Sequence, residues 1–311
     1  MQKFKKQMSF SKNFSSNRGR ILVEDAVDDL IKEHKLLGYR ERTLTDYNIH
    51  MMKMCEINEV HYLDELDRQC LMNYIQLNEN AKPSTRRTRL KAVRAVLTKF
   101  LDRGMIEYAF WKDINIRVDE EVKEGTTEEE IMVLFNMLDF DDYIEFRDFT
   151  AILFIWETGI RMNTLQNIEM NIFDFENNLV NFPPSIMKNH KGLKLPFSDD
   201  LAMLIKRLDA WNKEIGYTGE KLFISSKPHL FEKTDFAKLY SKRTQQYQKR
   251  FGVKNIRAHD LRRGFAKRML ETGINIAVVS KALSHSSIAT TTKYLHYSND
   301  EVIDELRKLN R

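Results

Sequence analysis

The chain has 311 residues, of which 42% are hydrophobic, enough to form a substantial core and, at this length, most naturally two domains. Its formal net charge of +5 permits nucleic-acid binding without proving it, so the placement of the basic residues matters more than their number. Because the two cysteines form no CxxC pair and no signal-peptide-like or membrane-length apolar run occurs, the sequence excludes a disulfide scaffold and a membrane protein and predicts a cytoplasmic protein with reduced thiols.

The N-terminal stretch, residues 1–20, is basic and polar. It contains six lysines and arginines and no acidic residue, mixed with serine, asparagine and glutamine. This composition predicts a flexible arm that lies along DNA phosphates, and it equally suits a solvated disordered tail.

Residues 21–116 show the apolar periodicity of helices throughout. Gly38, capping threonines at positions 43 and 45, and the Pro83-Ser84 pair mark the breaks between helices. The predicted helices cover residues 23–37, about 45–57, 63–76 and about 84–100. This half of the chain is therefore predicted to be a helical module.

The last of these helices has two distinct faces. Its apolar stripe consists of Leu90, Val93, Leu97 and Phe100, and its basic face of Arg86, Arg87, Arg89, Lys91 and Arg94. Residues 85–101 contain no acidic side chain. A basic stripe backed by an apolar one predicts docking on DNA, and the alternative is an ordinary solvated helix face.

A polar stretch at residues 117–127, which contains Gly125, predicts a linker, so that a second domain covers residues 128–311. Thr126 or Thr127 caps a helix that runs to Leu138, and a strongly apolar helix is expected at residues 143–157.

Short apolar runs between residues 171 and 198 alternate with turn-forming residues and predict a few antiparallel strands. Two further helices are expected at residues 199–215 and 234–251. The second of them carries Lys242 and Arg243, which form another candidate surface for DNA phosphates.

Four side chains of catalytic type gather in the C-terminal stretch 258–294, namely His259, Arg262, His285 and Tyr294. The apolar residues between them have helical spacing, so short helices would carry two imidazoles, a guanidinium and a phenol toward one place. That set suits a phosphate, because the cationic groups can donate to its oxygens and the phenol can attack its phosphorus.

The sequence resembles the tyrosine recombinase (phage integrase) family at these residues. The family's His-x-x-Arg motif stands as His259-Asp260-Leu261-Arg262. Its Leu-Gly-His motif, followed nine residues later by the nucleophilic tyrosine, stands as Leu283-Ser284-His285 and Tyr294, with Ser284 in place of the usual glycine.

The resemblance extends to two earlier segments. Residues 158–165 resemble the family's first motif and make Arg161 the first catalytic arginine. Lys188, eight residues before Pro196, matches the lysine that the family takes from a hairpin, with Lys191 and Lys194 close by. One departure is Thr164, which stands where the family usually has a carboxylate that helps to orient the catalytic groups. A threonine accepts a hydrogen bond but brings no charge, so its support is weaker.

The resemblance implies a mainly α fold with a small antiparallel β-sheet, in which a helical core-binding domain precedes an α+β catalytic domain. It also implies site-specific DNA recombination through a 3′-phosphotyrosyl intermediate. Arg161, Arg262 and His285 would bind the phosphate, Tyr294 would attack it, and Lys188 would protonate the leaving 5′-oxygen. His259 would accept the phenol proton or hold the phosphate. No metal or cofactor is expected.

The implied partners are double-stranded DNA with inverted-repeat core sites and further copies of the chain, as a dimer or a tetramer on DNA. An accessory DNA-bending or directionality protein and a location at the nucleoid are also implied. Residues 300–309 are predicted to form an amphipathic helix that would pack on a neighbouring protomer or on its own domain.

Two alternatives belong to other functional classes. The first is a catalytically impaired DNA-binding regulator on the same scaffold, which Thr164 and a helix-turn-helix reading of residues 274–295 would favour. The second is a type IB topoisomerase, which shares the chemistry and would relax supercoiled DNA without a defined site.

Overall fold

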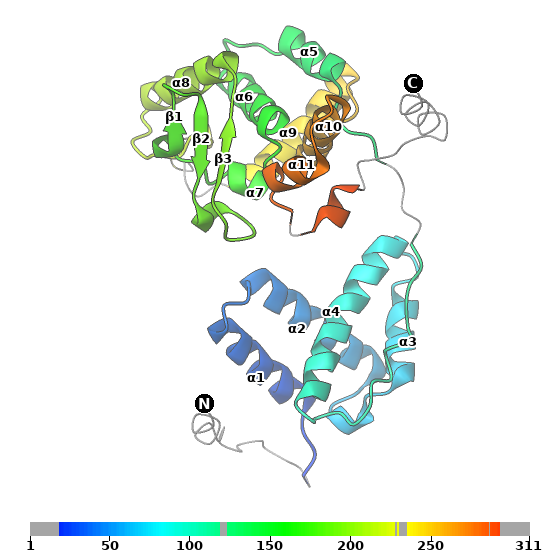
Figure 1. Ribbon diagram of the computed structural model, residues 1–311. Coiled ribbons are helices and arrows are strands. Elements are labelled where there is room, and N and C mark those ends of the chain that lie inside the picture. Colours follow the sequence, from blue (N-terminus) through cyan, green and yellow to red (C-terminus); the bar gives the residue numbers. More distant parts are fainter. Residues whose placement is uncertain (1–18, 119–122, 228, 230–234, 286, 293–311) are drawn as a thin grey trace, which may run out of the picture. The chain divides into compact units, whose positions relative to one another are not determined.

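The computed structural model describes residues 19–118, 123–227, 229, 235–285 and 287–292. The chain divides into two compact units, Met1–Glu121 and Val122–Arg311 (Figure 1). The described residues are mostly helical, with one small antiparallel sheet in the second unit, which confirms the predicted fold class.

The first unit packs its helices around one apolar core. Its elements are α1 (Val23–Leu36), α2 (Glu41–Asn58), the 3-10 turn η2 (Leu63–Glu65), α3 (Arg68–Leu77) and α4 (Pro83–Asp102). Pro83 occupies the first turn of α4, where a missing N–H costs no hydrogen bond. The apolar stripe of α4 is buried against α2, and the segment after α4 adds Phe110 and Trp111 to the same core. The predicted stripe is therefore the inner face of α4, whereas Lys91 of the basic face is exposed and the arginines of that face are partly buried.

The second unit is built around one helix that is covered on nearly all sides. Its elements are α5 (Glu128–Met137), α6 (Tyr143–Thr158), α7 (Met162–Leu165), η3 (Met170–Ile172), β1 (Phe173–Asp174), β2 (Leu179–Phe182), η4 (Pro184–Ile186), β3 (Leu193–Pro196), α8 (Asp199–Glu214), α9 (Phe236–Phe251), α10 (Ala258–Glu271), α11 (Ile276–Ala282) and η6 (Ile288–Thr290). Helix α6 packs against α8 and α10, and its apolar residues form the centre of the core. A helix that is apolar all round is stable only as a buried one.

The sheet has the order β1-β2-β3, with both pairs antiparallel. Val180 lies opposite Leu195, and both side chains face the core of the second unit. The register fixes the turn between β2 and β3, which carries Lys188. The sheet therefore fixes both ends of the connection that carries Lys188.

Gly159 ends α6 and directs the chain toward Arg161. Its φ of +62° lies in the left-handed region, which glycine adopts without steric cost. A side chain at this position would also clash with the ring of Phe265 on α10. Glycine is thus required both for the backbone turn and for the close packing of α6 against α10.

A buried ionic group joins α6 to α9. Asp148 is fully buried and accepts hydrogen bonds from Arg147 Nη2 at 2.7 Å, Tyr247 Oη at 2.9 Å and Arg243 Nε at 3.3 Å. Several donors offset the cost of burying the carboxylate. Arg243, expected from the sequence to face DNA, therefore has an interior partner, whereas the neighbouring Lys242 is exposed.

Candidate active site

Two arginines from distant segments meet at the C-terminal end of α11. Arg262, on α10, is buried and donates from Nη1 to the Gly159 carbonyl and from Nη2 to the Leu283 carbonyl. Arg161, which precedes α7, donates from Nη1 and Nη2 to the Ser284 carbonyl at 3.4 and 3.3 Å. The end of a helix carries partial negative charge, so it is a favourable place to hold two guanidinium groups close together.

The end of α11 is closed by a left-handed residue. The Ser284 N–H donates to the Lys281 carbonyl at 2.9 Å and the His285 N–H to the Ser280 carbonyl at 3.0 Å, which is the pattern of a Schellman cap. Ser284 has a φ of +50°. This cap turns the Ser284 carbonyl toward Arg161 and places His285 directly after the turn.

Replacing Ser284 with glycine is expected to raise the free energy of unfolding by about 1 kcal/mol, because glycine adopts positive φ without the Cβ clash that serine pays. Chemical denaturation of the two proteins measures the difference. Ser280→Gly is the matched control: it lies inside α11, where glycine is expected to lower stability instead. A destabilised Ser284→Gly variant would contradict the account of the cap.

The two histidines of the motif lie near these arginines and carry lowered pKa values. Burial, followed by the charges of Arg262 and Arg161, lowers the pKa of His285 to about 4. Burial, followed by the charges of Arg262 and Arg263, also lowers the pKa of His259. Both imidazoles are therefore neutral at pH 7, and each has one donor and one acceptor nitrogen.

His285 is held by a residue that the sequence analysis missed. Its Nδ1 lies 2.8 Å from Oγ1 of Thr291, which is fully buried beside η6. This contact fixes the orientation of the imidazole ring. The only sequence signal for Thr291 is its place in a run of serines and threonines, which does not distinguish it from its neighbours.

The His285 pKa predicts how stability depends on pH. The imidazole of an unfolded chain takes up a proton near pH 6.5, whereas the folded one stays neutral until about pH 4. Between these values the unfolded state binds more protons, so this contribution to stability is complete above pH 6.5 and is lost as the pH falls toward 4.

We therefore expect the melting temperature of wild type to fall more between pH 7.5 and pH 4.5 than that of His285→Gln, which has no proton to take up. Thermal unfolding of both proteins is measured across this range. Because the two proteins share the same carboxylates, the effect of carboxylate titration cancels in the difference between their melting temperatures. Parallel curves for the two proteins would contradict the lowered pKa.

The helix that carries His259 and Arg262 is held by the chain segment that precedes α5. The Thr126 N–H donates to the Asp260 carbonyl at 3.0 Å, and Arg263 Nε donates to the Glu124 carbonyl at 3.2 Å. A side chain on Gly264 would clash with the Thr126 backbone. Glycine at this position therefore allows the segment to lie directly across α10.

Lys188 lies on the exposed turn that follows η4, directly after the buried Met187. Thr164 connects this turn with the first arginine. Its N–H donates to the Arg161 carbonyl at 2.8 Å, and its Oγ1 donates to the Ile186 carbonyl at 3.3 Å. The structure thus brings Arg161, Arg262 and His285 together and links Lys188 to Arg161 through Thr164.

The described residues do not include residues 1–18 of the predicted basic arm, Tyr294 or the helix expected at residues 300–309. Within the described part of the chain, no group of three His, Cys, Asp or Glu side chains is arranged to hold a metal ion. Among the same residues, no helix combines the length and the apolar character needed to cross a membrane.

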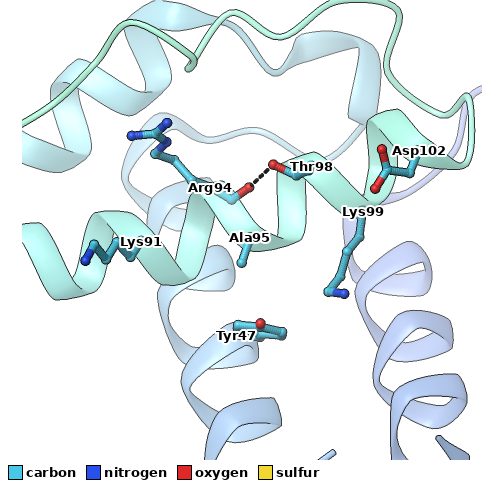
Figure 2. A pocket seen from close by; sticks show the side chains of 7 residues that line it. All are labelled: Tyr47, Lys91, Arg94, Ala95, Thr98, Lys99 and Asp102. Atoms are coloured by element: carbon cyan, nitrogen blue, oxygen red, sulfur yellow. Dashed lines mark hydrogen bonds between the residues drawn. The ribbon is translucent and has the colours of Figure 1, made fainter. Parts of the chain in front are cut away.

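The basic face of α4 borders an open cavity of about 390 Å³ in the first unit (Figure 2). The cavity is lined by Tyr47 of α2 and by Lys91, Arg94, Ala95, Thr98, Lys99 and Asp102 of α4. Figure 2 shows Lys91 and Lys99 one to each side of the small Ala95, with Tyr47 facing α4. The lining combines three basic side chains with the single carboxylate of Asp102, so the cavity carries a net positive charge.

The three arginines of α4 that were predicted to bind DNA are all partly buried in the first unit. Arg94 donates from Nη1 to Asn115 Oδ1 at 2.8 Å and to the Ile114 carbonyl at 3.1 Å, so it braces the segment after α4. The Nε atom of Arg86 is buried without a hydrogen-bond partner in the described structure. Arg87 is partly buried, and Lys91 is exposed.

Comparison with known proteins gives consistent results. The family model described as the phage integrase family matches residues 125–301. The chain is 25% identical over 285 residues to a tyrosine recombinase of Thermosipho africanus, a match that covers 87% of this chain and 94% of that protein. It is also 30% identical over 168 residues to a probable integrase/recombinase of Acholeplasma phage L2, covering 54% of each.

Solved structures of similar fold include the Tn1549 transposon integrase in complex with transposon right end DNA. That structure has a TM-score of 0.75 at 15% identity, and the match covers 94% of this chain and 100% of the other. A lambda integrase dimer bound to a core site has a TM-score of 0.67 at 13% identity, covering 90% and 80%. At these identities the likeness shows a shared fold.

Proposed function

This chain belongs to the phage integrase family, and on that basis we propose that it is a site-specific DNA recombinase of the tyrosine type. It would integrate or excise a phage or mobile element by cutting and rejoining DNA through a 3′-phosphotyrosyl intermediate. The observation that carries the proposal is the meeting of Arg161, Arg262 and His285 at the C-terminal cap of α11. A site with these donors suits the dianionic charge that develops on a phosphate under attack.

The two arginines are assigned to the non-bridging oxygens of the scissile phosphate. A guanidinium presents its N–H groups in a planar fork that matches two phosphate oxygens. We assign the Thr291 hydroxyl as the donor to His285 Nδ1, which leaves the imidazole proton on Nε2 and makes Nε2 a further donor to the phosphate. Neutral His285 fits this role, because it donates without adding a third positive charge beside the arginines.

The covalent step is assigned to Tyr294 and Lys188. The bond from Tyr294 Oη to phosphorus forms as the bond from phosphorus to the 5′-oxygen breaks. The phenol proton passes to His259, which is neutral and can accept it, and Lys188 supplies a proton to the departing 5′-oxygen. The bond energy stays in the phosphotyrosine, so another 5′-hydroxyl can rejoin the strand without ATP.

The first unit is proposed to bind double-stranded DNA through the cavity face of α4. Lys91 and Lys99 flank Ala95 on this face, and Arg87 lies one turn before Lys91. Lys242, in the second unit, is a separate candidate contact for phosphates, whereas Arg94 and Arg243 bind partners within their own units. Copies of the chain would bind inverted-repeat sites and assemble into dimers and tetramers on DNA.

Changing Lys91 and Lys99 together to alanine is expected to weaken DNA binding and to reduce the slope of log affinity against log salt by about 1 to 2, because each lost phosphate contact removes about 0.9 from the slope. Binding measured between 50 and 300 mM salt gives the slope. Lys32→Ala with Lys35→Ala on α1 is the matched control, since both lysines are exposed and lie away from the cavity. An unchanged slope in the α4 variant would place the DNA surface elsewhere.

The proposed function is tested by trapping the covalent intermediate. Nicked duplexes made from DNA that flanks the gene, or from a random library, release a short fragment that bears the 5′-hydroxyl after cleavage, and its loss prevents rejoining. A protein–DNA adduct that survives denaturation would support the recombinase and map the cleavage point. Tight, specific binding without any adduct would favour the regulator. Relaxation of supercoiled DNA without a defined site would favour a topoisomerase.

A further inference from the structure

We propose that Thr164 is a positioning residue that aligns Lys188 with the scissile phosphate, and that it does so by donating a hydrogen bond, which a carboxylate at this position could not do. The inference rests on the proposed function, in which Lys188 protonates the leaving oxygen. It assigns Thr164 a role of its own, so that the threonine is not merely a weaker substitute for an acidic residue.

The backbone and the side chain of Thr164 hold two different parts of the site. Its N–H donates to the Arg161 carbonyl at 2.8 Å within the first turn of α7. Its hydroxyl donates to the Ile186 carbonyl at 3.3 Å and lies 3.9 Å from the sulfur of Met187. A single residue thus links the segment of Arg161 to the segment of Lys188, although the two segments are far apart in the sequence.

The chain between Ile186 and Lys188 is fixed on its inner side. Met187 is 4% exposed and belongs to the core of the second unit, and its N–H donates to the Pro184 carbonyl at 3.2 Å. Met187 has an extended backbone, with a ψ of 138°, so the next side chain points away from it. With Met187 anchored inside and Ile186 held by Thr164, the position of the Lys188 side chain is constrained at its base.

The groups around the side chain of residue 164 require a hydrogen-bond donor at this position. Thr164 is 3% exposed, and its hydroxyl faces a carbonyl oxygen and a thioether, both of which accept hydrogen bonds. An ionised glutamate or aspartate has only acceptors, so its carboxylate would meet the Ile186 carbonyl with like partial charge in a place closed to water. A carboxylate at position 164 is therefore expected to displace the turn that carries Lys188, not to restore an ideal site.

The test uses two versions of one nicked duplex that contains the mapped cleavage site. In the first, the leaving atom is the normal 5′-oxygen, which needs a proton as it departs. In the second, sulfur replaces this bridging oxygen, and the thiolate leaves with its electron pair without a proton, because thiols have a pKa of about 8.5. A defect that acts through the general acid slows cleavage of the first duplex and spares the second.

We expect Thr164→Val, which keeps the volume and removes the hydroxyl, to cleave the oxygen duplex about 10-fold more slowly than wild type, because a displaced catalytic group loses much of its effect. The same variant should match wild type within about twofold on the sulfur duplex. Thr164→Ser, which retains the donor, should restore most of the rate, and Thr164→Glu should be slower than Thr164→Val on the oxygen duplex. Lys188→Ala should show the same pattern with a larger defect, whereas Arg161→Lys should slow both duplexes.

The outcomes separate this inference from the function on which it rests. Equal slowing of both duplexes by Thr164→Val, unchanged cleavage of both, or faster cleavage by Thr164→Glu would overturn the positioning role while leaving the recombinase intact. No adduct from wild type on either duplex would overturn the proposed function and this inference with it. Melting temperatures of the variants show whether a slower rate reflects loss of fold, and an unfolded Thr164→Val leaves the decision to the comparison of Thr164→Ser and Thr164→Glu.

Discussion

Replacing Tyr294 with phenylalanine is expected to abolish the covalent protein–DNA adduct while changing DNA affinity by less than about twofold. The substitution removes one oxygen, the atom that would form the bond to phosphorus, and keeps the aromatic ring. Phenylalanine has no nucleophilic atom at all, so the loss should be complete within detection and not a partial fall in rate. Denaturing gels of the nicked duplex measure the adduct, and binding at equilibrium measures affinity.

The chain supplies a matched control three residues further on. Tyr297→Phe makes the same chemical change in the same segment, and it should leave the adduct at the wild-type level. An adduct that persists in Tyr294→Phe and disappears in Tyr297→Phe would move the nucleophile to Tyr297. This comparison is informative because both tyrosines lie outside the described residues, so their assignment rests on the spacing from His285 alone.

Much of the fold could be predicted from local pattern. The apolar periodicity of α4 and α6 and the turn signals of the small sheet each depend on neighbouring residues, which the sequence displays directly. The structure starts α4 at Pro83, one residue before the predicted start, and caps α5 with Thr127, one of the two threonines that the sequence offered. Local rules succeed here because the cap and the buried stripe favour the same helix bounds.

The partners of the charged residues could not be predicted in the same way. Arg94 and Arg243 lie on helix faces that look basic in the sequence, yet Arg94 braces the segment after α4 and Arg243 binds the buried Asp148. Their acceptors lie about twenty and about a hundred residues away along the chain. A helical stripe specifies which side chains share a face, but it does not specify what packs against that face.

For the motif residues too, the sequence predicts one part of the site and only the structure shows the other. The spacing of His259, Arg262 and His285 indicates a shared site, and the structure brings Arg262 and His285 to the end of α11. The departures from the family pattern acquire a meaning only in three dimensions. Ser284 occupies a left-handed position that favours glycine, and Thr164 donates a hydrogen bond to a backbone carbonyl, which an ionised carboxylate cannot do. Departing from the family pattern thus costs backbone strain at Ser284, whereas at Thr164 it replaces one interaction with another.

Replacing Arg262 with alanine is expected to lower the free energy of unfolding by about 2 to 5 kcal/mol as well as to stop DNA cleavage. Arg262 is 4% exposed and satisfies the carbonyls of Gly159 and Leu283, so the shorter side chain would leave both acceptors buried without their donor. Each unsatisfied group costs about 1 to 3 kcal/mol. Urea denaturation measures the loss of stability, and the adduct assay measures cleavage.

Arg262→Lys tests whether the positive charge of Arg262 is sufficient or whether its two diverging N–H donors are also needed. Lysine keeps the positive charge, but a single ammonium cannot reproduce two diverging N–H donors to Gly159 and Leu283 and also bind a phosphate. We therefore expect reduced stability and a fall in cleavage of about 100-fold or more.

Arg161→Lys provides the contrast. Arg161 is only partly buried, and its hydrogen bonds to the Ser284 carbonyl are long, at 3.3 and 3.4 Å. We expect this variant to lose cleavage to a similar degree while it keeps nearly all of its stability. If Arg161→Lys lost as much stability as Arg262→Lys, the assignment of different structural roles to the two arginines would be wrong. A stable but inactive Arg161 variant beside a destabilised Arg262 variant would show that one arginine mainly binds the phosphate, while the other also joins α6, α10 and α11 into the frame of the site.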